Sequence, residues 1–352
     1  MNEKNDLQLL FQYRGALMGI AALWILVTHE WQIVSFEGEW IYEIERFWKR
    51  IGFCGVDIFM ILSGMGMVFS LEKNSIIRFY YNRIKRIIIP FWFMASVVAF
   101  IDKWDKVFYF KVITGIAFFR INIYSFLWFV PAIITFYILV PIFYAVFKRA
   151  KNKYIFILAV LEIWLLVSLL LKAYMREDLY GFTNRIPIFI MGVFLGWICR
   201  EKTVHFNKTT WIFLIITLIL GLYLAYQSNM NGMQLILPVS NCCIPNFLIA
   251  VSLPLLIAKV MDMLCTVKVI KYADIILIKI FSFFGMISLE FYCVQEWIAK
   301  KILPEMVQHA DNLLVNLELL IIVSVCGMVL YLINKSIVKG FDFIDTHFIN
   351  VN

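Results

Sequence analysis

Apolar blocks alternate with short polar segments along nearly the whole chain. The blocks run to roughly 17–25 residues, the length at which an α-helix crosses the hydrocarbon core of a bilayer. The aromatic segment 105–121 carries Lys106, Lys111 and Arg120, and we interpret it as a partly interfacial connection. The remaining blocks predict ten spanning helices at about 14–31, 52–71, 84–101, 125–147, 154–172, 184–199, 209–226, 243–262, 280–299 and 315–334.

Composition agrees with this pattern. Of the 352 residues, 62% are hydrophobic and 16% are charged, whereas a soluble domain carries about 25% charged residues. We therefore predict an all-α, polytopic membrane bundle that forms a single domain over 1–352. The polar segment Met1–Tyr13 lacks a small-residue cleavage site, so we expect the first span to be retained.

The net charge of +8 is explained by the loops rather than by a nucleic-acid partner. With the N-terminus inside, the inner segments hold 20 of the 32 Lys and Arg residues. Cytoplasmic loops are enriched in these residues, so we predict that both termini are cytoplasmic. The Lys- and Ile-rich composition is typical of a bacterial plasma membrane. The seven cysteines form no CxxC pair, and we expect no metal site.

His29 lies near the outer end of the first predicted span. An ionisable residue at membrane depth is costly and often faces a water-filled cavity, and histidine moves protons near neutral pH. An ordinary headgroup-level histidine is an equally good interpretation of the position alone. Arg14, at the inner end of the same helix, lies fifteen residues away, about 22 Å at 1.5 Å per residue.

Asp57 lies near the outer end of the second span, in a glycine-rich segment that permits close helix packing. Asp57 could accept a hydrogen bond from His29 and orient its ring, or it could cap its own helix. Ser63 lies deeper in this span and is better explained as a packing hydroxyl than as a nucleophile.

Arg83 and Arg86 are three residues apart on the cytoplasmic side, so they share a helix face. Such a pair can bind phosphate, although basic residues there also serve as ordinary membrane anchors. Glu290, within the ninth span, requires a partner or a raised pKa. Glu162 in the fifth span is similar, with weaker surroundings.

Together these segments resemble the acyltransferase-3 family of membrane O-acyltransferases. The resemblance covers nearly the whole chain as a ten-span layout. It is carried by His29, by the segments 55–64, 83–90 and 288–292, and more softly by the segments 127–129 and 185–192.

The resemblance implies transfer of an acyl group, usually acetyl, from cytoplasmic acyl-CoA to a hydroxyl of an extracytoplasmic glycan. His29 matches the family's essential histidine. Arg83 and Arg86 match its cytoplasmic arginine pair. The family often has a further arginine in the first span, and Arg14 is the arginine of this chain that lies nearest to that position. A sugar hydroxyl needs a general base, which His29 would supply with Asp57 or another carboxylate such as Glu290.

Two positions depart from the family pattern. Met18 stands where the family often has an arginine, and Gln295 stands where the motif of the ninth span often ends in histidine. A transporter or flippase of a lipid-linked saccharide is the main alternative, since it would use the same polar residues to line a path. A non-catalytic membrane scaffold is the third hypothesis.

Overall fold

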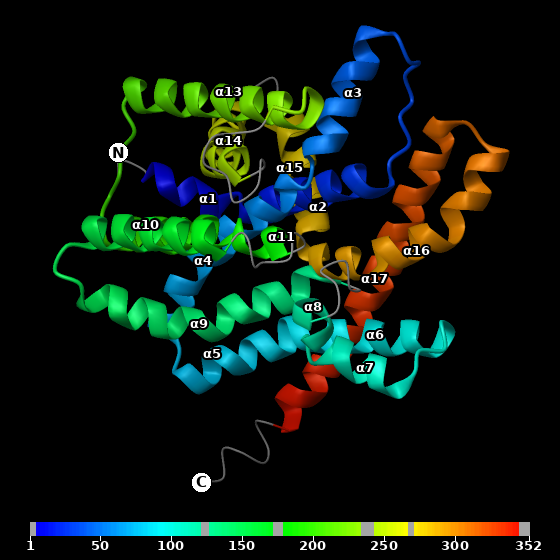
Figure 1. Ribbon diagram of the computed structural model, residues 1–352, viewed down its shortest axis with the longest axis horizontal. Coiled ribbons are helices and arrows are strands. Elements are labelled where there is room, and N and C mark those ends of the chain that lie inside the picture. The colour runs from blue at the N-terminus through cyan, green and yellow to red at the C-terminus, as the bar shows by residue number, and fades with distance from the viewer. Residues whose placement is uncertain (1–4, 121–126, 172–178, 234–242, 267–270, 345–352) are drawn as a thin grey trace. The chain divides into compact units, whose positions relative to one another are not determined.

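A computed structural model describes residues 5–120, 127–171, 179–233, 243–266 and 271–344. Every regular element in these ranges is helical (Figure 1), which confirms the all-α prediction. The contacts divide the chain into two compact units. Unit 1 comprises residues 1–76 and 132–286, and unit 2 comprises residues 77–131 and 287–352. The expectation of one domain over 1–352 stays a prediction.

Most helices belong to unit 1. In chain order they are η1 (Asp6–Gln8), α1 (Leu9–Gln12), α2 (Arg14–Glu30), α3 (Trp40–Ile51), α4 (Cys54–Lys73), α10 (Lys153–Leu171), α11 (Tyr180–Thr183), α12 (Ile186–Glu201), α13 (Lys208–Met230), α14 (Cys243–Leu264) and α15 (Lys271–Met286).

Unit 2 is built around the third span and the C-terminal helices. Its helices are η2 (Ile84–Ile88), α6 (Ile89–Ile101), α7 (Lys106–Ile113), α8 (Ile116–Arg120), α16 (Ser288–His309) and α17 (Asn312–Ile344). Two further helices, α5 (Ile76–Arg83) and α9 (Phe129–Arg149), continue from one unit into the other.

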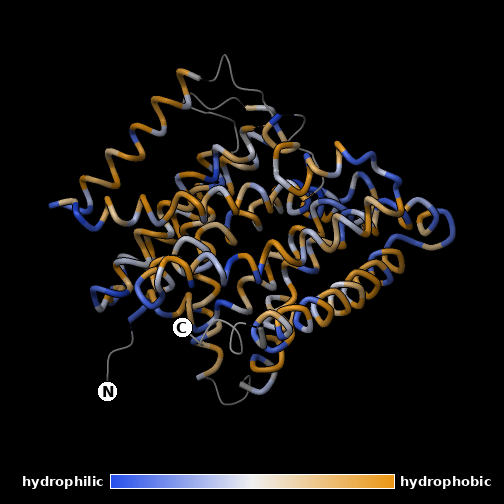
Figure 2. Tube along the Cα trace, turned by 90° about the horizontal axis from the view of Figure 1, so that it is seen from below, coloured by the Kyte–Doolittle hydropathy of each residue, from blue (hydrophilic) through white to orange (hydrophobic). Residues whose placement is uncertain are grey.

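The prediction of a polytopic membrane protein is confirmed. Among the described residues, eight helices are long and apolar enough to cross a membrane, and two bent helix pairs raise the number to ten. The helices in Figure 2 are mostly coloured as hydrophobic, and hydrophilic residues gather in the connections. The described part of segment 105–121, up to residue 120, forms the short helices α7 and α8. Residues 125–126 and 172 of the predicted spans lie outside the described ranges.

The third and ninth predicted spans differ from expectation. The third begins at Ile76 rather than residue 84 and contains the π-helical turn η2, where the N–H of Ile89 bonds to the carbonyl of Ile84. Pro90 follows directly and has no N–H to donate, so the usual bonding pattern is interrupted there. The ninth span is divided at Ile287, whose ψ of 8° ends α15 before α16 begins.

The first span is also preceded by a bend. The short helical segment Asp6–Gln12 meets α2 at an angle of 66°, and Tyr13, with φ −101° and ψ 12°, lies at the junction. The predicted span 14–31 itself agrees with α2 to within one residue.

Glycines bring α4 and α12 into close contact in unit 1. A Cβ at Gly64 would lie 2.4 Å from the carbonyl oxygen of Phe189, and a Cβ at Gly192 would lie 2.3 Å from that of Ile61. Real Cβ atoms do not approach so closely, so both backbones require glycine. Small residues serve this purpose between membrane helices because close approach maximises van der Waals contact.

The same device joins α2 to α15. A Cβ at Gly19 would lie 1.8 Å from the carbonyl oxygen of Phe281, and a Cβ at Gly285 would lie 1.9 Å from that of Gly15. The N-terminal half of the helix that carries His29 is therefore held in close contact with α15.

Polar contacts in unit 1 join the helix ends that were predicted to share the inner side. Glu72, at the end of α4, accepts hydrogen bonds from Tyr144 at 2.9 Å and Lys148 at 3.0 Å, and it pairs with Arg200 at 3.1 Å. These partners come from the ends of α9 and α12. The contacts agree with the predicted alternation of span direction, while the identity of that side as cytoplasmic stays a prediction.

Candidate active site

Asp57 occupies the first turn of α4 and is fully buried. Its Oδ1 lies 3.2 Å from the guanidinium Nε of Arg185, and its Oδ2 accepts a hydrogen bond of 2.8 Å from the side-chain amide of Asn246. The amide oxygen of Asn246 in turn accepts from the thiol of Cys54 at 3.4 Å. A buried carboxylate is tolerated when it is paired and hydrogen-bonded, and this network meets both conditions.

The network links the ends of three spans. Asp57 belongs to α4, Arg185 is the N-cap of α12, and Asn246 lies in the first turn of α14. These are the helix ends predicted to lie on the outer side. The hydrogen-bonded carboxylate of α4 therefore joins two helices whose contact residues lie more than 100 residues later in the sequence.

The packing of α2 against α4 keeps His29 away from Asp57. The Ala21 carbonyl and the Ile25 side chain of α2 face Gly55, and Trp24 and Thr28 face Gly52. Both contacts place His29 and Asp57 about eight residues apart along the packed helices, which is about 12 Å at 1.5 Å per residue.

Among the described residues, the partners of the Asp57 carboxylate are Arg185 and Asn246, and the hydrogen bond from His29 considered from the sequence is not one of its contacts. His29 itself is exposed in the last turn of α2, next to the buried Glu30. An exposed imidazole at a helix end is accessible to a substrate, which a buried one would not be.

The loop and helix that follow His29 fold back onto α2. Trp24 donates its indole N–H to the carbonyl of Trp48 on α3 at 3.0 Å. Glu45 of α3 accepts the backbone N–H groups of Val34 and Ser35 at 2.9 and 3.1 Å, and the Ser35 hydroxyl at 2.7 Å. Burial raises the pKa of Glu45, but these hydrogen bonds outweigh that effect and lower its pKa below the usual value.

A second ionic network lies in unit 2. Arg86, in the π-helical turn η2, places its Nη1 2.7 Å from Oε1 of Glu290 on α16. The side-chain amide of Asn334 on α17 donates to the same oxygen at 3.2 Å. Glu290 is fully buried, whereas 41% of the Arg86 side chain is exposed. The covered carboxylate thus holds Nη1 of a guanidinium whose side chain is partly exposed.

Arg83 lies one turn before Arg86 and has its guanidinium carbon 4.9 Å from the centre of the Phe79 ring. Both arginines are therefore oriented by groups of unit 2. Arg14 belongs to unit 1, where its guanidinium lies over Gly66, 3.7 Å from the position that a Cβ would take there.

The motif of the ninth span has a defined environment. The Tyr292 hydroxyl accepts a hydrogen bond of 3.3 Å from the backbone N–H of Phe129, at the start of α9. Gln295, at the position of the family histidine, is buried, and its Oε1 accepts no hydrogen bond from any described residue. Glutamine there fills the position without supplying a proton donor–acceptor of useful pKa.

Sequence reasoning missed three partners of the buried carboxylates, namely Arg185, Asn246 and Asn334. Each is a polar residue at the edge of an apolar block, and that placement is the signal that could have found them. Within the part of the chain that the structure describes, no group of three or more His, Cys, Asp or Glu residues could hold a metal ion.

Comparison with known proteins addresses the family directly. No curated protein and no solved structure matches the chain. A family model for the acyltransferase domain of the acyltransferase-3 family matches residues 16–333. That range contains His29 and both ion pairs, Asp57–Arg185 and Arg86–Glu290, and it covers all or most of each long apolar helix. The chain therefore belongs to the acyltransferase-3 family of membrane acyltransferases.

Proposed function

We propose that this protein is an O-acetyltransferase of the plasma membrane of a bacterium. It moves an acetyl group from cytoplasmic acetyl-CoA to a hydroxyl of an extracytoplasmic or lipid-linked polysaccharide. The family match supports acyl transfer. The acetyl donor and the glycan acceptor follow from the family resemblance of the His29 and Arg83–Arg86 segments.

The observation that carries the proposal is the environment of Arg86. A buried ion pair that served only stability would have both partners covered, but here the carboxylate is covered and the cation is not. Guanidinium groups bind phosphate through several donors at fixed geometry. Arg86 is held by Glu290 and lies one helical turn after Arg83, and a pair of guanidinium groups so placed suits the phosphates of a CoA donor.

His29 is the proposed general base. The acceptor hydroxyl loses its proton to the imidazole while its oxygen attacks the thioester carbonyl. The new C–O bond forms, the C–S bond breaks, and the CoA thiolate leaves and takes up the proton from the imidazolium. A positioned base of this kind contributes about 10²- to 10⁴-fold to the rate.

Asp57 has a positioning role in this scheme. Its carboxylate is committed to Arg185 and Asn246, so it does not touch the acceptor. By joining the outer ends of α4, α12 and α14, it holds the scaffold against which α2 packs. Glu290 is likewise a positioning residue, because it acts through Arg86.

The test is acetyl-CoA binding and turnover by the purified, reconstituted protein. His29→Gln should bind acetyl-CoA normally and lose turnover by about 10²-fold or more. Arg86→Ala should lose donor binding. His205→Gln and Arg120→Ala, which change exposed residues elsewhere, are the matched controls and should behave like wild type.

Two outcomes would overturn the proposal. Folded wild-type protein that binds no acetyl-CoA would favour the transport of a lipid-linked saccharide, which a vesicle flipping assay then measures. Full turnover in His29→Gln would remove His29 from the chemistry.

A further inference from the structure

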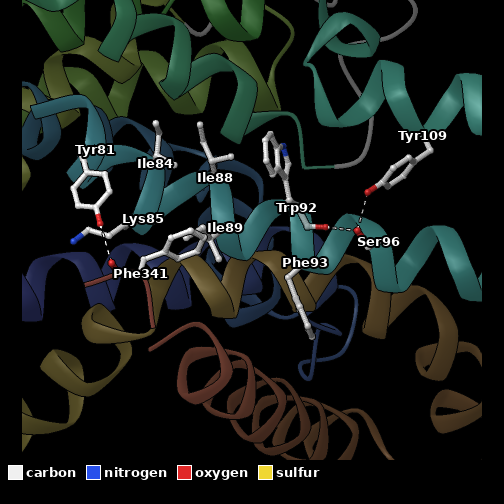
Figure 3. A pocket seen from close by; sticks show the side chains of 10 residues that line it. All are labelled: Tyr81, Ile84, Lys85, Ile88, Ile89, Trp92, Phe93, Ser96, Tyr109 and Phe341. Carbon is white, nitrogen blue, oxygen red and sulfur yellow. Dashed lines mark hydrogen bonds between the residues drawn. The ribbon is translucent and has the colours of Figure 1, made fainter. Parts of the chain in front are cut away.

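A groove of unit 2 lies outside both ionic networks. It follows the helix formed by the end of α5, η2 and α6, and it is bordered by α7 and the end of α17 (Figure 3). Its volume is about 440 Å³. The middle of the groove is apolar, with Ile88, Ile89 and Trp92 facing into it. Trp92 is 49% exposed, while its indole N–H is satisfied by the carbonyl of Ile113 at 3.0 Å.

The two ends of the groove are polar and different. At one end Lys85 pairs with Asp342, and the hydroxyl of Tyr81 donates to the carbonyl of Phe341 at 3.5 Å. At the other end the hydroxyls of Ser96 and Tyr109 are hydrogen-bonded at 2.8 Å (Figure 3). One end is therefore charged, and the far end is closed by a neutral pair.

The length of the groove matches one leaflet of a bilayer. Lys85 and Ser96 are eleven residues apart, about 16 Å along a helix. Half of a typical hydrocarbon core is about 15 Å. Ile88, Ile89 and Trp92 line the groove along this length, so its middle is long and apolar enough to take a hydrocarbon chain.

The charged end carries a surplus of positive charge. Arg78 and Lys85 both lie over the Tyr81 ring, at 5.2 and 4.3 Å from its centroid, and Asp342 is the acidic partner of Lys85. Lys85 has three donors, of which the carboxylate takes one. An anionic headgroup at this end would therefore be favoured.

The groove is separate from the arginines assigned to the acyl donor. Arg83 and Arg86 lie roughly a third to a half of a turn around the helix from Tyr81, Lys85 and Trp92. The guanidinium of Arg86 is directed toward Glu290 on α16. A chain in the groove would thus lie behind the donor-binding face and not on it.

We propose that this groove is a binding site for one acyl chain of an anionic phospholipid of the inner leaflet, with the lipid phosphate at Lys85. The site is distinct from acyl transfer. It places a lipid against the helix that presents Arg83 and Arg86, so the lipid supports that helix from behind.

A photoreactive phosphatidylglycerol with a diazirine in its acyl chain tests the proposal on the delipidated full-length protein. Labelling should concentrate on residues 84–96 and on Tyr109. Ile88→Trp fills the groove and should abolish this labelling. Its matched control, Ile212→Trp, changes an exposed residue of α13 in unit 1 and should leave it unchanged. Both variants are checked for wild-type melting temperature.

The headgroup is tested by competition and charge. Unlabelled phosphatidylglycerol should displace the probe better than phosphatidylcholine does. Lys85→Gln should weaken binding about fivefold, the effect of one basic residue at an anionic surface, and Asp342→Asn should strengthen it.

Three outcomes would overturn the proposal. They are equal labelling of α13 and the groove, no preference for the anionic lipid, and displacement by palmitoyl-CoA but not by phosphatidylglycerol. The last would make the groove an acyl-donor site. Acetyl-CoA binding by Ile88→Trp, measured in parallel, separates failure of the lipid site from failure of the proposed acyl transfer.

Discussion

Each unit contains a buried carboxylate paired with an arginine, but the exposure of the arginine differs between the two units. In unit 1, Asp57 and Arg185 are both buried, at 0% and 6% side-chain exposure. In unit 2, Glu290 is fully buried but Arg86 is 41% exposed. Each carboxylate also accepts one asparagine amide, from Asn246 and Asn334 respectively. The chemistry of the two sets is nearly identical, and only the exposure of the cation differs.

That difference separates a structural ion pair from a binding one. Desolvation of two charges is costly, so a covered pair is retained only where its geometry is satisfied, and removing one partner leaves an unpaired buried charge. A half-exposed guanidinium loses less of its hydration than a buried one, and a ligand in the solvent can reach it. We therefore expect changes to the first pair to alter stability and changes to the second to alter donor binding.

The largest effect is expected from Arg185→Met. It leaves the Asp57 carboxylate buried without its cation, which should cost about 3–5 kcal/mol of unfolding free energy. Denaturation in mixed micelles measures it. The double variant Asp57→Leu/Arg185→Met, which removes both charges, should recover much of the loss. Equal loss in the single and double variants would contradict the ion-pair explanation.

The next effect is expected from Glu290→Gln. Glutamine keeps the size of the side chain but removes the charge that orients Arg86, so acetyl-CoA affinity should fall about 10- to 100-fold, the range of a charge-assisted hydrogen bond. Isothermal titration measures the affinity. Unchanged donor binding together with a large loss of melting temperature would instead class this pair with the one in unit 1.

The two asparagines provide a matched comparison of smaller size. Interhelical hydrogen bonds in membrane proteins are worth about 0.6–1.7 kcal/mol. Asn246→Ala should lower the unfolding free energy by that amount and leave donor affinity alone. Asn334→Ala should lower donor affinity by a few-fold. The unfolding free energy and the acetyl-CoA affinity are measured for both variants. A change in stability alone in both variants would contradict the distinction between the two units.

The smallest effect is expected from Glu45, a carboxylate that lies outside the spans and, among the described residues, is hydrogen-bonded without an ion pair to an arginine. Its pKa is lowered in the folded protein, so its stabilisation is present above the unfolded pKa of about 4.3 and is lost as the pH falls through the folded value. The melting temperature of wild type should exceed that of Glu45→Gln near neutral pH, by an amount corresponding to less than about 1 kcal/mol. The difference should vanish in acid, and a difference that grew in acid would reverse the sign of the linkage.

Much of the fold could be predicted because span formation is a local property. A bilayer requires about 20 apolar residues for each helix, and that length is readable from one segment at a time. The limits of α2, α4, α13 and α14 accordingly agree with prediction to within four residues. Breaks depend on single residues. Pro90 leaves carbonyls without a donor, and the backbone bends at Ile287. Neither feature changes the hydropathy of the segment, so the start of the third span and the break in the ninth were not predicted.

The sequence by itself determined that the chain is a membrane protein and which residues were candidates for chemistry. It also carried the motifs of the acyltransferase-3 family. Only the tertiary structure decided the partners. Asp57 meets Arg185 and Asn246, and Glu290 meets Arg86, across 128 to 204 residues of chain. The physical reason is that both the lipid-facing and the packed faces of membrane helices are apolar, so the pattern of one helix does not say which neighbour it meets.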